Sequence, residues 1–151
     1  MKTIRIPPKL KKLYAVAKKA RSHAYAPHSG CQVGAAIRLA NGKIFPGCNV
    51  ENASYGGTVC AERGAIQSAI CAEGKIRIAE ILVVTDANPP WLPCGLCRQV
   101  ISEFVADAPE GDITIYATNT KGEMTAIDFT RLYPGLFSPV ELRAGQKKKR
   151  K

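Results

Sequence analysis

The sequence predicts an α/β fold, a three-layer α-β-α sandwich around a five-stranded mixed sheet. Two observations lead to this prediction. Helix-like and strand-like segments follow one another in the order α-β-β-α-β-α-β-β along the 151 residues. The third strand-like segment, Ile78 to Thr85, is an almost continuous apolar run, which is typical of a strand covered on both faces. Helices on both sides of one sheet satisfy both observations, and the length suits a single domain.

The N-terminal part predicts one helix and one antiparallel pair of strands. From Lys9 to His23, apolar residues recur at three- and four-residue spacing with lysines between them, as in a surface amphipathic helix. Gln32 to Ala40 and Lys43 to Asn49 have strand-like sequences. The Asn41-Gly42 pair between them is a strong hairpin signal, so we expect the two strands to pair directly.

Two further helices alternate with the remaining strands. Cys60 to Glu73 predicts a helix that ends near Gly74, where glycine suits the helix terminus. A proline-rich loop follows the apolar strand at 78–85 and leads into a second inner helix. That helix spans Gly95 to Ala106, and the last two strands span Asp112 to Ala117 and Glu123 to Ile127.

Composition and charge exclude several classes of protein. Hydrophobic residues make up 46% of the chain, as in ordinary globular proteins and unlike fibrous or disordered ones. The formal net charge is +10, and the run Lys147 to Lys151 supplies half of it. We expect a domain over residues 1–145 and a basic, disordered tail over 146–151, which leaves nuclear entry or a weak RNA contact open. No secretory signal or membrane-spanning run is present, so we expect a cytoplasmic protein.

Three of the six cysteines stand at the starts of two predicted helices, and they are Cys60, Cys94 and Cys97. Free N–H groups and the helix dipole at such a position favour the thiolate, which is the form that binds zinc. Three thiolates leave one tetrahedral position open, as catalytic zinc sites do. Zinc in such a site lowers the pKa of bound water to about 7. We therefore expect one catalytic Zn²⁺ rather than a set of disulfides.

Two charged residues follow Cys60 directly. Glu62 lies in the first helical turn, close enough to the metal to move a proton from water to a leaving group without being a ligand. Zinc deaminases of nucleobases combine the same elements, including a P-C-x-x-C segment, here Pro93 to Cys97. Arg63 is placed to hydrogen-bond the thiolate sulfurs and offset their negative charge, and Arg98 is a second candidate for this role.

The alternative interpretation of the three cysteines is a structural zinc site, with Glu62 as an acidic residue that merely favours the helix N-terminus. A structural site would need a fourth ligand. The candidates lack partner spacing with the three cysteines, and they are Cys31, Cys48, Cys71, His23 and His28.

Six ordered motifs between about residues 13 and 142 resemble the homotetrameric cytidine deaminase family. They are Ala24–Pro27, Val33–Ala36, Gly47–Tyr55, Cys60–Arg63, Pro93–Gln99 and Leu132–Phe137. The resemblance implies a hydrolase that converts cytidine and deoxycytidine to uridine and deoxyuridine with release of ammonia, in pyrimidine salvage. It also implies one Zn²⁺ per subunit and a homotetramer whose active sites are shared between subunits.

The resemblance further implies the residues that bind the substrate. Asn49 and Glu51 would hold the ribose 3′-hydroxyl, and residues two apart on an extended segment do point the same way. The backbone N–H of Ala61 would help hold the base carbonyl. Tyr55 and Phe137 would reach across a subunit interface, with Phe137 near the base.

One segment departs from the family pattern P-Y-S-x-F-x-V-G. His28 replaces the usual tyrosine, and Cys31 replaces the usual aromatic that stacks on the base. Losing such a stack costs about 1–3 kcal/mol. One hypothesis is a wider pocket, lined by Cys31, that binds plain cytidine more weakly or accepts cytosine nucleosides substituted at N4 or C5. The other is that Cys31 is a small core residue and that an aromatic comes from elsewhere.

The sequence fits other functions less well than deamination of a nucleoside. A cytosine-containing antibiotic is a possible substrate class, but Asn49 and Glu51 favour a ribose. Editing of a polynucleotide would need a run of basic and aromatic residues along a strand-binding groove, and the core has none that is obvious. A non-catalytic, zinc-stabilised RNA-binding or scaffold protein would not need Glu62. We expect a small nucleoside and water as partners, and neither a nucleic acid nor a membrane.

Overall fold

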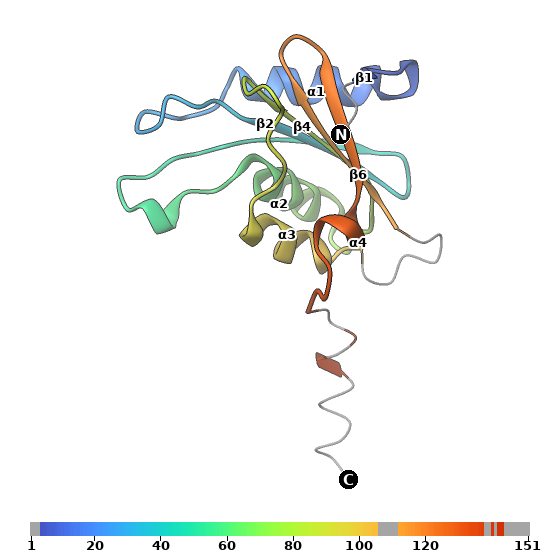
Figure 1. Ribbon diagram of the computed structural model, residues 1–151. Helices are drawn as coiled ribbons and strands as arrows, with labels where there is room; N and C mark the ends of the chain where they lie inside the picture. The colour runs from blue at the N-terminus through green and yellow to red at the C-terminus, as the bar shows by residue number, and fades with distance from the viewer. Residues whose placement is uncertain (1–3, 106–111, 138–139, 141, 144–151) are drawn as a thin grey trace.

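The computed structural model describes residues 4–105, 112–137, 140 and 142–143. Its six strands form one mixed sheet in the order β1-β6-β5-β4-β2-β3. Helix α1 covers one face, and α2 and α3 cover the other (Figure 1). The strands are β1 Ile4–Arg5, β2 Gly34–Leu39, β3 Ile44–Cys48, β4 Ile78–Thr85, β5 Thr114–Asn119 and β6 Glu123–Asp128. The helices are η1 Pro8–Leu10, α1 Lys11–Arg21, η2 Tyr55–Gly57, α2 Ala61–Glu73, α3 Gly95–Ser102 and α4 Phe129–Leu132.

The predicted three-layer α/β sandwich is confirmed, and its two cores follow from strand alternation. Successive side chains of a strand point to opposite faces of the sheet. Ala36 of β2 therefore packs in the cluster that contains Leu13 of α1. Its neighbours Ala35 and Ile37 pack in the cluster that contains Ala65 of α2. Strand β4 is mostly apolar on both faces, because its side chains contribute to both clusters.

The pairing of the strands brings two loops to one end of the sheet. Strands β4 and β5 pair in parallel, whereas β2 pairs antiparallel with both β3 and β4. In this register the start of β2 lies beside the ends of β3 and β4, since Gly34 pairs with both Cys48 and Val84. The loop after β3 leads to α2, and the loop after β4 leads to α3. Both helices therefore begin near the same end of the sheet.

Glycine at position 47 lets α2 approach the sheet more closely than any side chain would allow. A Cβ at Gly47 would lie 2.2 Å from the carbonyl oxygen of Ala61 and 2.2 Å from the backbone nitrogen of Ala65. The first turns of α2 thus rest directly on the backbone of β3. This contact fixes the position of the α2 N-terminus.

Three short elements were not predicted from the sequence: strand β1 and the helices η2 and α4. All five predicted strands are present, and the sixth, β1, adds two residues to the edge of the sheet by pairing Ile4 with Met124 and Arg5 with Glu123. Two residues are too few to show an alternating pattern. Helix α3 ends at Ser102, and Ala106, where we expected its end, lies outside the described residues.

The predicted tail at residues 146–151, and with it the domain boundary at 145, also lies outside the described residues. Within the described part of the chain, none of the helices combines the length and hydrophobicity needed to cross a bilayer.

Candidate active site

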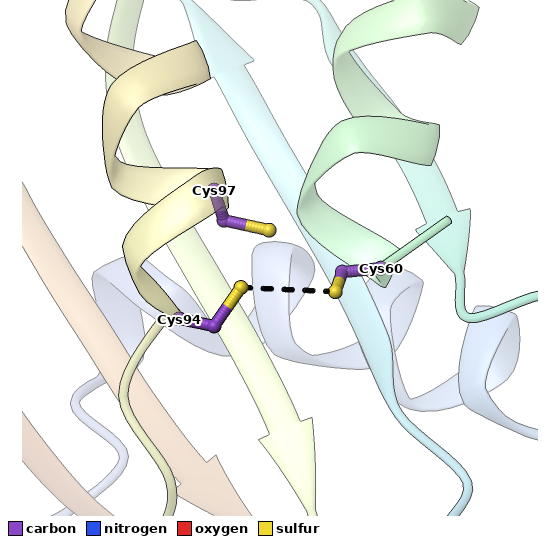
Figure 2. Close-up of side chains that lie close together, drawn as sticks. All are labelled: Cys60, Cys94 and Cys97. Atoms are coloured by element: carbon purple, nitrogen blue, oxygen red, sulfur yellow. Dashed lines mark hydrogen bonds between the residues drawn. The ribbon is translucent and has the colours of Figure 1, made fainter. Parts of the chain in front are cut away.

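The three predicted zinc ligands meet between the N-termini of α2 and α3. Cys60 is the N-cap residue of α2, Cys94 is the N-cap residue of α3, and Cys97 lies in the first turn of α3. Their sulfur atoms all lie within 4.8 Å of one another, and the sulfurs of Cys60 and Cys94 are 3.9 Å apart. Figure 2 shows the three side chains pointing toward one another from the two helices.

This donor set fits one zinc ion with an open coordination position. All six cysteines and both histidines lie in the described part of the chain. None of the six cysteines forms a disulfide. None of the five other candidate ligands lies close enough to join the cluster. Among the described residues, no other group of three or more side chains is placed to bind a metal ion. Since a structural zinc site is closed by four protein ligands, the geometry favours a catalytic site.

The cluster is electrostatically prepared for a cation. Hydrogen bonding by the Cys97 thiol, followed by contacts from Arg63 and Cys94, lowers the pKa of Cys60 to about 5. The same hydrogen bond, together with burial, raises the pKa of Cys97. Cys60 is therefore a thiolate at neutral pH. A metal ion binds thiolates and displaces the remaining thiol proton, because metal binding and deprotonation are linked.

Arg63 occupies the predicted position beside the cluster. Its Nη2 donates a hydrogen bond of 2.8 Å to the carbonyl oxygen of Thr58 and a longer one of 3.7 Å to the sulfur of Cys60. The guanidinium thus places a positive charge beside the sulfur of Cys60. Arg98, the second candidate, instead donates to the carbonyl oxygens of Pro93 and Leu132, and so supports the loop rather than the sulfurs.

Glu62 is buried in the first turn of α2, with only 4% of its surface exposed. Burial raises the pKa of its carboxyl group to about 7. A carboxyl with a pKa near the working pH both accepts and donates protons readily. Glu62 therefore has the properties of a general acid and base beside the cysteine cluster.

A cavity of about 190 Å³ connects these groups. Cys60, Cys94 and Glu62 line it, and so do three of the predicted substrate-binding residues: Cys31, Asn49 and Ala61. The cavity thus combines a site for a Lewis-acidic metal, a buried proton carrier and walls of uncharged side chains. Such a combination suits hydrolysis of a small, uncharged molecule.

Comparison with known proteins identifies the family. The family model of the cytidine and deoxycytidylate deaminase zinc-binding region matches residues 7–108, a range that contains all three cysteines and Glu62. The chain belongs to the cytidine and deoxycytidylate deaminase family.

Individual deaminases match most of the chain. A cytidine deaminase from Sporosarcina psychrophila is 43% identical over 133 residues, which are 88% of this chain and 94% of that protein. One from Halalkalibacterium halodurans is 41% identical over 124 residues, 82% of this chain and 90% of its own length. The crystal structure of cytidine deaminase from Burkholderia pseudomallei has a TM-score of 0.76 at 40% identity, covering 87% of this chain and all of that one. The structure from Mycobacterium leprae has a TM-score of 0.68 at 35% identity, covering 85% and 99%.

Asn49 and Glu51, the pair that the deaminase resemblance assigns to the ribose, both hydrogen-bond to the segment that carries His28 and Cys31. The amide of Asn49 donates to the carbonyl oxygen of Cys31 and accepts from the N–H of Val33, each at 2.8 Å. The carboxylate of Glu51 accepts from the N–H of His28 at 2.7 Å, and also from the N–H and hydroxyl of Ser29. The two side chains therefore hold this segment in place. Both side chains thus point toward the same loop, as expected for residues two positions apart on an extended segment.

The remaining predicted residues of the deaminase site are less enclosed. Glu51 and Tyr55 line a second cavity of about 270 Å³, which shares Ser29 and Thr58 with the first. Tyr55 is 78% exposed and Phe137 is 58% exposed, and Phe137 is not among the described residues that line either cavity. The fold of one chain thus brings most of the predicted residues together and leaves these two aromatics at the surface.

The aromatic residue that lines the deaminase cavity was not predicted from the sequence. Trp91 lines it, together with its neighbour Leu92, from the proline-rich loop that precedes Cys94. The available signal was the position of Trp91 only three residues before a predicted metal ligand. The proline-rich composition identified the loop but not the direction in which its one aromatic side chain points.

Proposed function

We propose that this protein hydrolyses cytidine and deoxycytidine to uridine and deoxyuridine with release of ammonia. One observation carries the proposal: a cluster of three cysteines with one coordination position to spare shares a cavity with a buried carboxyl group. Membership of the deaminase family supports the same reaction, and the names of the relatives support cytidine as the substrate.

One Zn²⁺ per subunit would be held by Cys60, Cys94 and Cys97. When bound, zinc supplies a Lewis acid that makes water acidic enough to yield hydroxide near neutral pH. Arg63 offsets the negative charge of the three sulfurs, and so keeps the site from opposing the ionisation of water. This role follows from its hydrogen bond to Cys60.

Glu62 moves the protons of the reaction. It takes one proton from the attacking water and gives it to ring N3 as the water oxygen bonds to C4. It then takes the second proton from the hydroxyl on C4 and gives it to the amino group as the C4–N4 bond breaks, so that ammonia leaves and C4 becomes a carbonyl. Its pKa of about 7 suits both steps, since neither protonation state is strongly preferred at neutral pH.

The walls of the cavity would orient the nucleoside. Ala61 is the first residue of α2, so its backbone N–H is one of the free donors at a helix N-terminus and is available to the base carbonyl. Asn49 lines the metal cavity and Glu51 the adjoining one, which supports a sugar lying across the two. Each side chain keeps hydrogen-bonding capacity beyond its contacts with the loop.

We also propose the homotetramer with shared active sites. The exposure of Tyr55 and Phe137 supports it, because large aromatic side chains at the surface suit burial by a neighbouring subunit. A cytoplasmic location and a role in pyrimidine salvage complete the proposal, and six free cysteines suit a reducing compartment.

The proposal is tested with the purified, zinc-replete protein and three substrates: cytidine, deoxycytidine and N4-methylcytidine. Turnover is followed by the ultraviolet change on deamination, and bound zinc is measured in the same samples. Turnover of cytidine or deoxycytidine with one zinc per chain supports the proposal. Stoichiometric zinc without turnover of either would contradict it, and turnover of N4-methylcytidine alone would favour the substituted nucleosides.

A further inference from the structure

The cavity beside the cysteine cluster has one aromatic wall, and it is not the wall where the family pattern places one. Cys31 lines the cavity at the position of the usual stacking aromatic. Among the described residues that line this cavity, Trp91 is the single aromatic. A thiol offers a base little contact area, whereas an indole ring offers a large flat face. Trp91 therefore offers the cavity the aromatic surface that Cys31 lacks.

The loop that carries Trp91 is tied to the metal site. Trp91 stands three residues before Cys94, between Pro90 and Pro93, and proline fixes one backbone angle at each of these positions. The carbonyl oxygen of Pro93 accepts a 2.8 Å hydrogen bond from Nε of Arg98, a residue of α3. These restraints hold the indole at a defined place relative to the cysteines.

Trp91 also lines another hollow beside the cavity. This larger hollow has a volume of about 730 Å³, and its other walls include Pro89, Arg98 and Thr125. The side chain is 52% exposed, so much of its apolar face has no protein partner within the described chain. An apolar face that remains open at a binding cavity gains stability when a planar ligand covers it.

We propose that Trp91 supplies the aromatic contact with the base that Cys31 cannot give, and that it thereby determines which bases the site accepts. This inference rests on the proposed function. It decides between the two hypotheses for Cys31 in favour of an aromatic that comes from another element. The indole contacts the pyrimidine ring and closes the cavity toward the larger hollow, so a shorter side chain would weaken the hold on plain cytidine and admit bulkier bases.

The chain offers an unusually direct probe, because Trp91 is its only tryptophan. Contact between a pyrimidine and an indole changes the fluorescence of the indole. Titration of the wild-type protein with uridine, which is not turned over, should change the emission saturably. Ribose alone is the matched control and should leave the emission unchanged.

Kinetics of three variants complete the test. Trp91→Ala should raise the KM for cytidine roughly 5- to 150-fold, as expected for a lost base stack, with a smaller change in kcat. It should also narrow the preference for cytidine over N4-methylcytidine. Trp91→Phe should have a KM close to that of wild type. The Cys31→Phe/Trp91→Ala double variant should have a lower KM than Trp91→Ala, because the new phenyl ring replaces part of the lost contact. Bound zinc, measured in every variant, identifies those in which the metal site itself is damaged.

A KM for cytidine within twofold of wild type in Trp91→Ala would overturn the inference, and so would a double variant no better than the single one. Failure of the proposed function gives a different result, namely no turnover by the zinc-loaded wild type. In that case titration with cytidine and uridine still decides, since a saturable change of the emission supports a contact with Trp91 and an unchanged emission rules it out.

Discussion

The side-chain amide of Asn49 donates a 2.8 Å hydrogen bond to the carbonyl oxygen of Cys31, eighteen positions earlier in the chain. A second bond, from the N–H of Val33 to the same amide, clamps the segment between them. Asn49 thus joins the end of β3 to the segment in which this chain departs from the family pattern. It is a support for the cavity wall as well as a candidate ligand for the ribose.

Replacing Asn49 tests this double role. Asn49→Ala leaves one backbone carbonyl and one backbone N–H unpaired in a partly buried place, which should lower the free energy of unfolding by about 1–3 kcal/mol. The KM for cytidine should rise as well. Urea denaturation and steady-state kinetics measure the two effects. If Asn49→Ala raised the KM but left the free energy of unfolding unchanged, Asn49 would bind the ribose without supporting the cavity wall.

Gly47→Ala tests the close contact between β3 and α2. The added methyl carbon would lie 2.2 Å from two backbone atoms of α2, so the helix must shift. We expect a loss of about 2 kcal/mol or more in stability and weaker zinc binding, because Cys60 moves with the helix. Gly56→Ala is the control, since a Cβ there has no neighbour within 4 Å. Equal stability of the two variants would refute the contact.

Much of this fold can be predicted from local sequence patterns. The elements that were not predicted were missed for physical reasons. Periodicity and the Asn41-Gly42 turn located the main helices and the strands, because alternation and amphipathicity are local properties. The spacing of Cys60, Cys94 and Cys97 indicated their meeting, since helix N-termini place each thiol near a strand end. The two-residue strand β1 leaves no pattern to detect.

The aromatic residues of the site were harder to predict for a different reason. Which face of a proline-rich loop points inward depends on tertiary packing, so the position of Trp91 three residues before Cys94 did not show that its side chain lines the cavity. The roles expected of Tyr55 and Phe137 involve a neighbouring subunit, and the fold of one chain leaves both exposed. The bonds that Asn49 and Glu51 make to the segment at 28–33 link residues far apart in sequence and were equally hidden.

Metal removal should abolish activity reversibly. Dialysis against a chelator should remove one zinc per chain, and one equivalent of Zn²⁺ should restore turnover. Cys94→Ser should retain far less zinc than wild type. Cys71→Ser is the matched control, because Cys71 is exposed on α2 and does not join the cluster. Elemental analysis measures the zinc content of both variants. Equal zinc contents would contradict the assigned ligands.

Arg63→Gln tests the positive charge beside Cys60. Without the guanidinium, the thiolate loses a hydrogen bond and the site becomes more negative, so kcat or zinc affinity should fall by roughly 10- to 100-fold. Arg38→Gln provides the comparison, since Arg38 pairs with Glu80 and does not line the cavity. Competition with a chromophoric chelator measures the affinity. If Arg63→Gln behaved like Arg38→Gln, the guanidinium would have no role at the metal.

The most direct test of the central claim is ammonia release from cytidine by the zinc-loaded protein and by its Glu62→Gln variant. The amide has nearly the same size but cannot take up and return a proton, so the two proteins should bind equal zinc while kcat falls at least about 100-fold in the variant. That result would establish the buried carboxyl as the proton carrier of a deaminase. Equal rates of ammonia release by the two proteins would contradict the account.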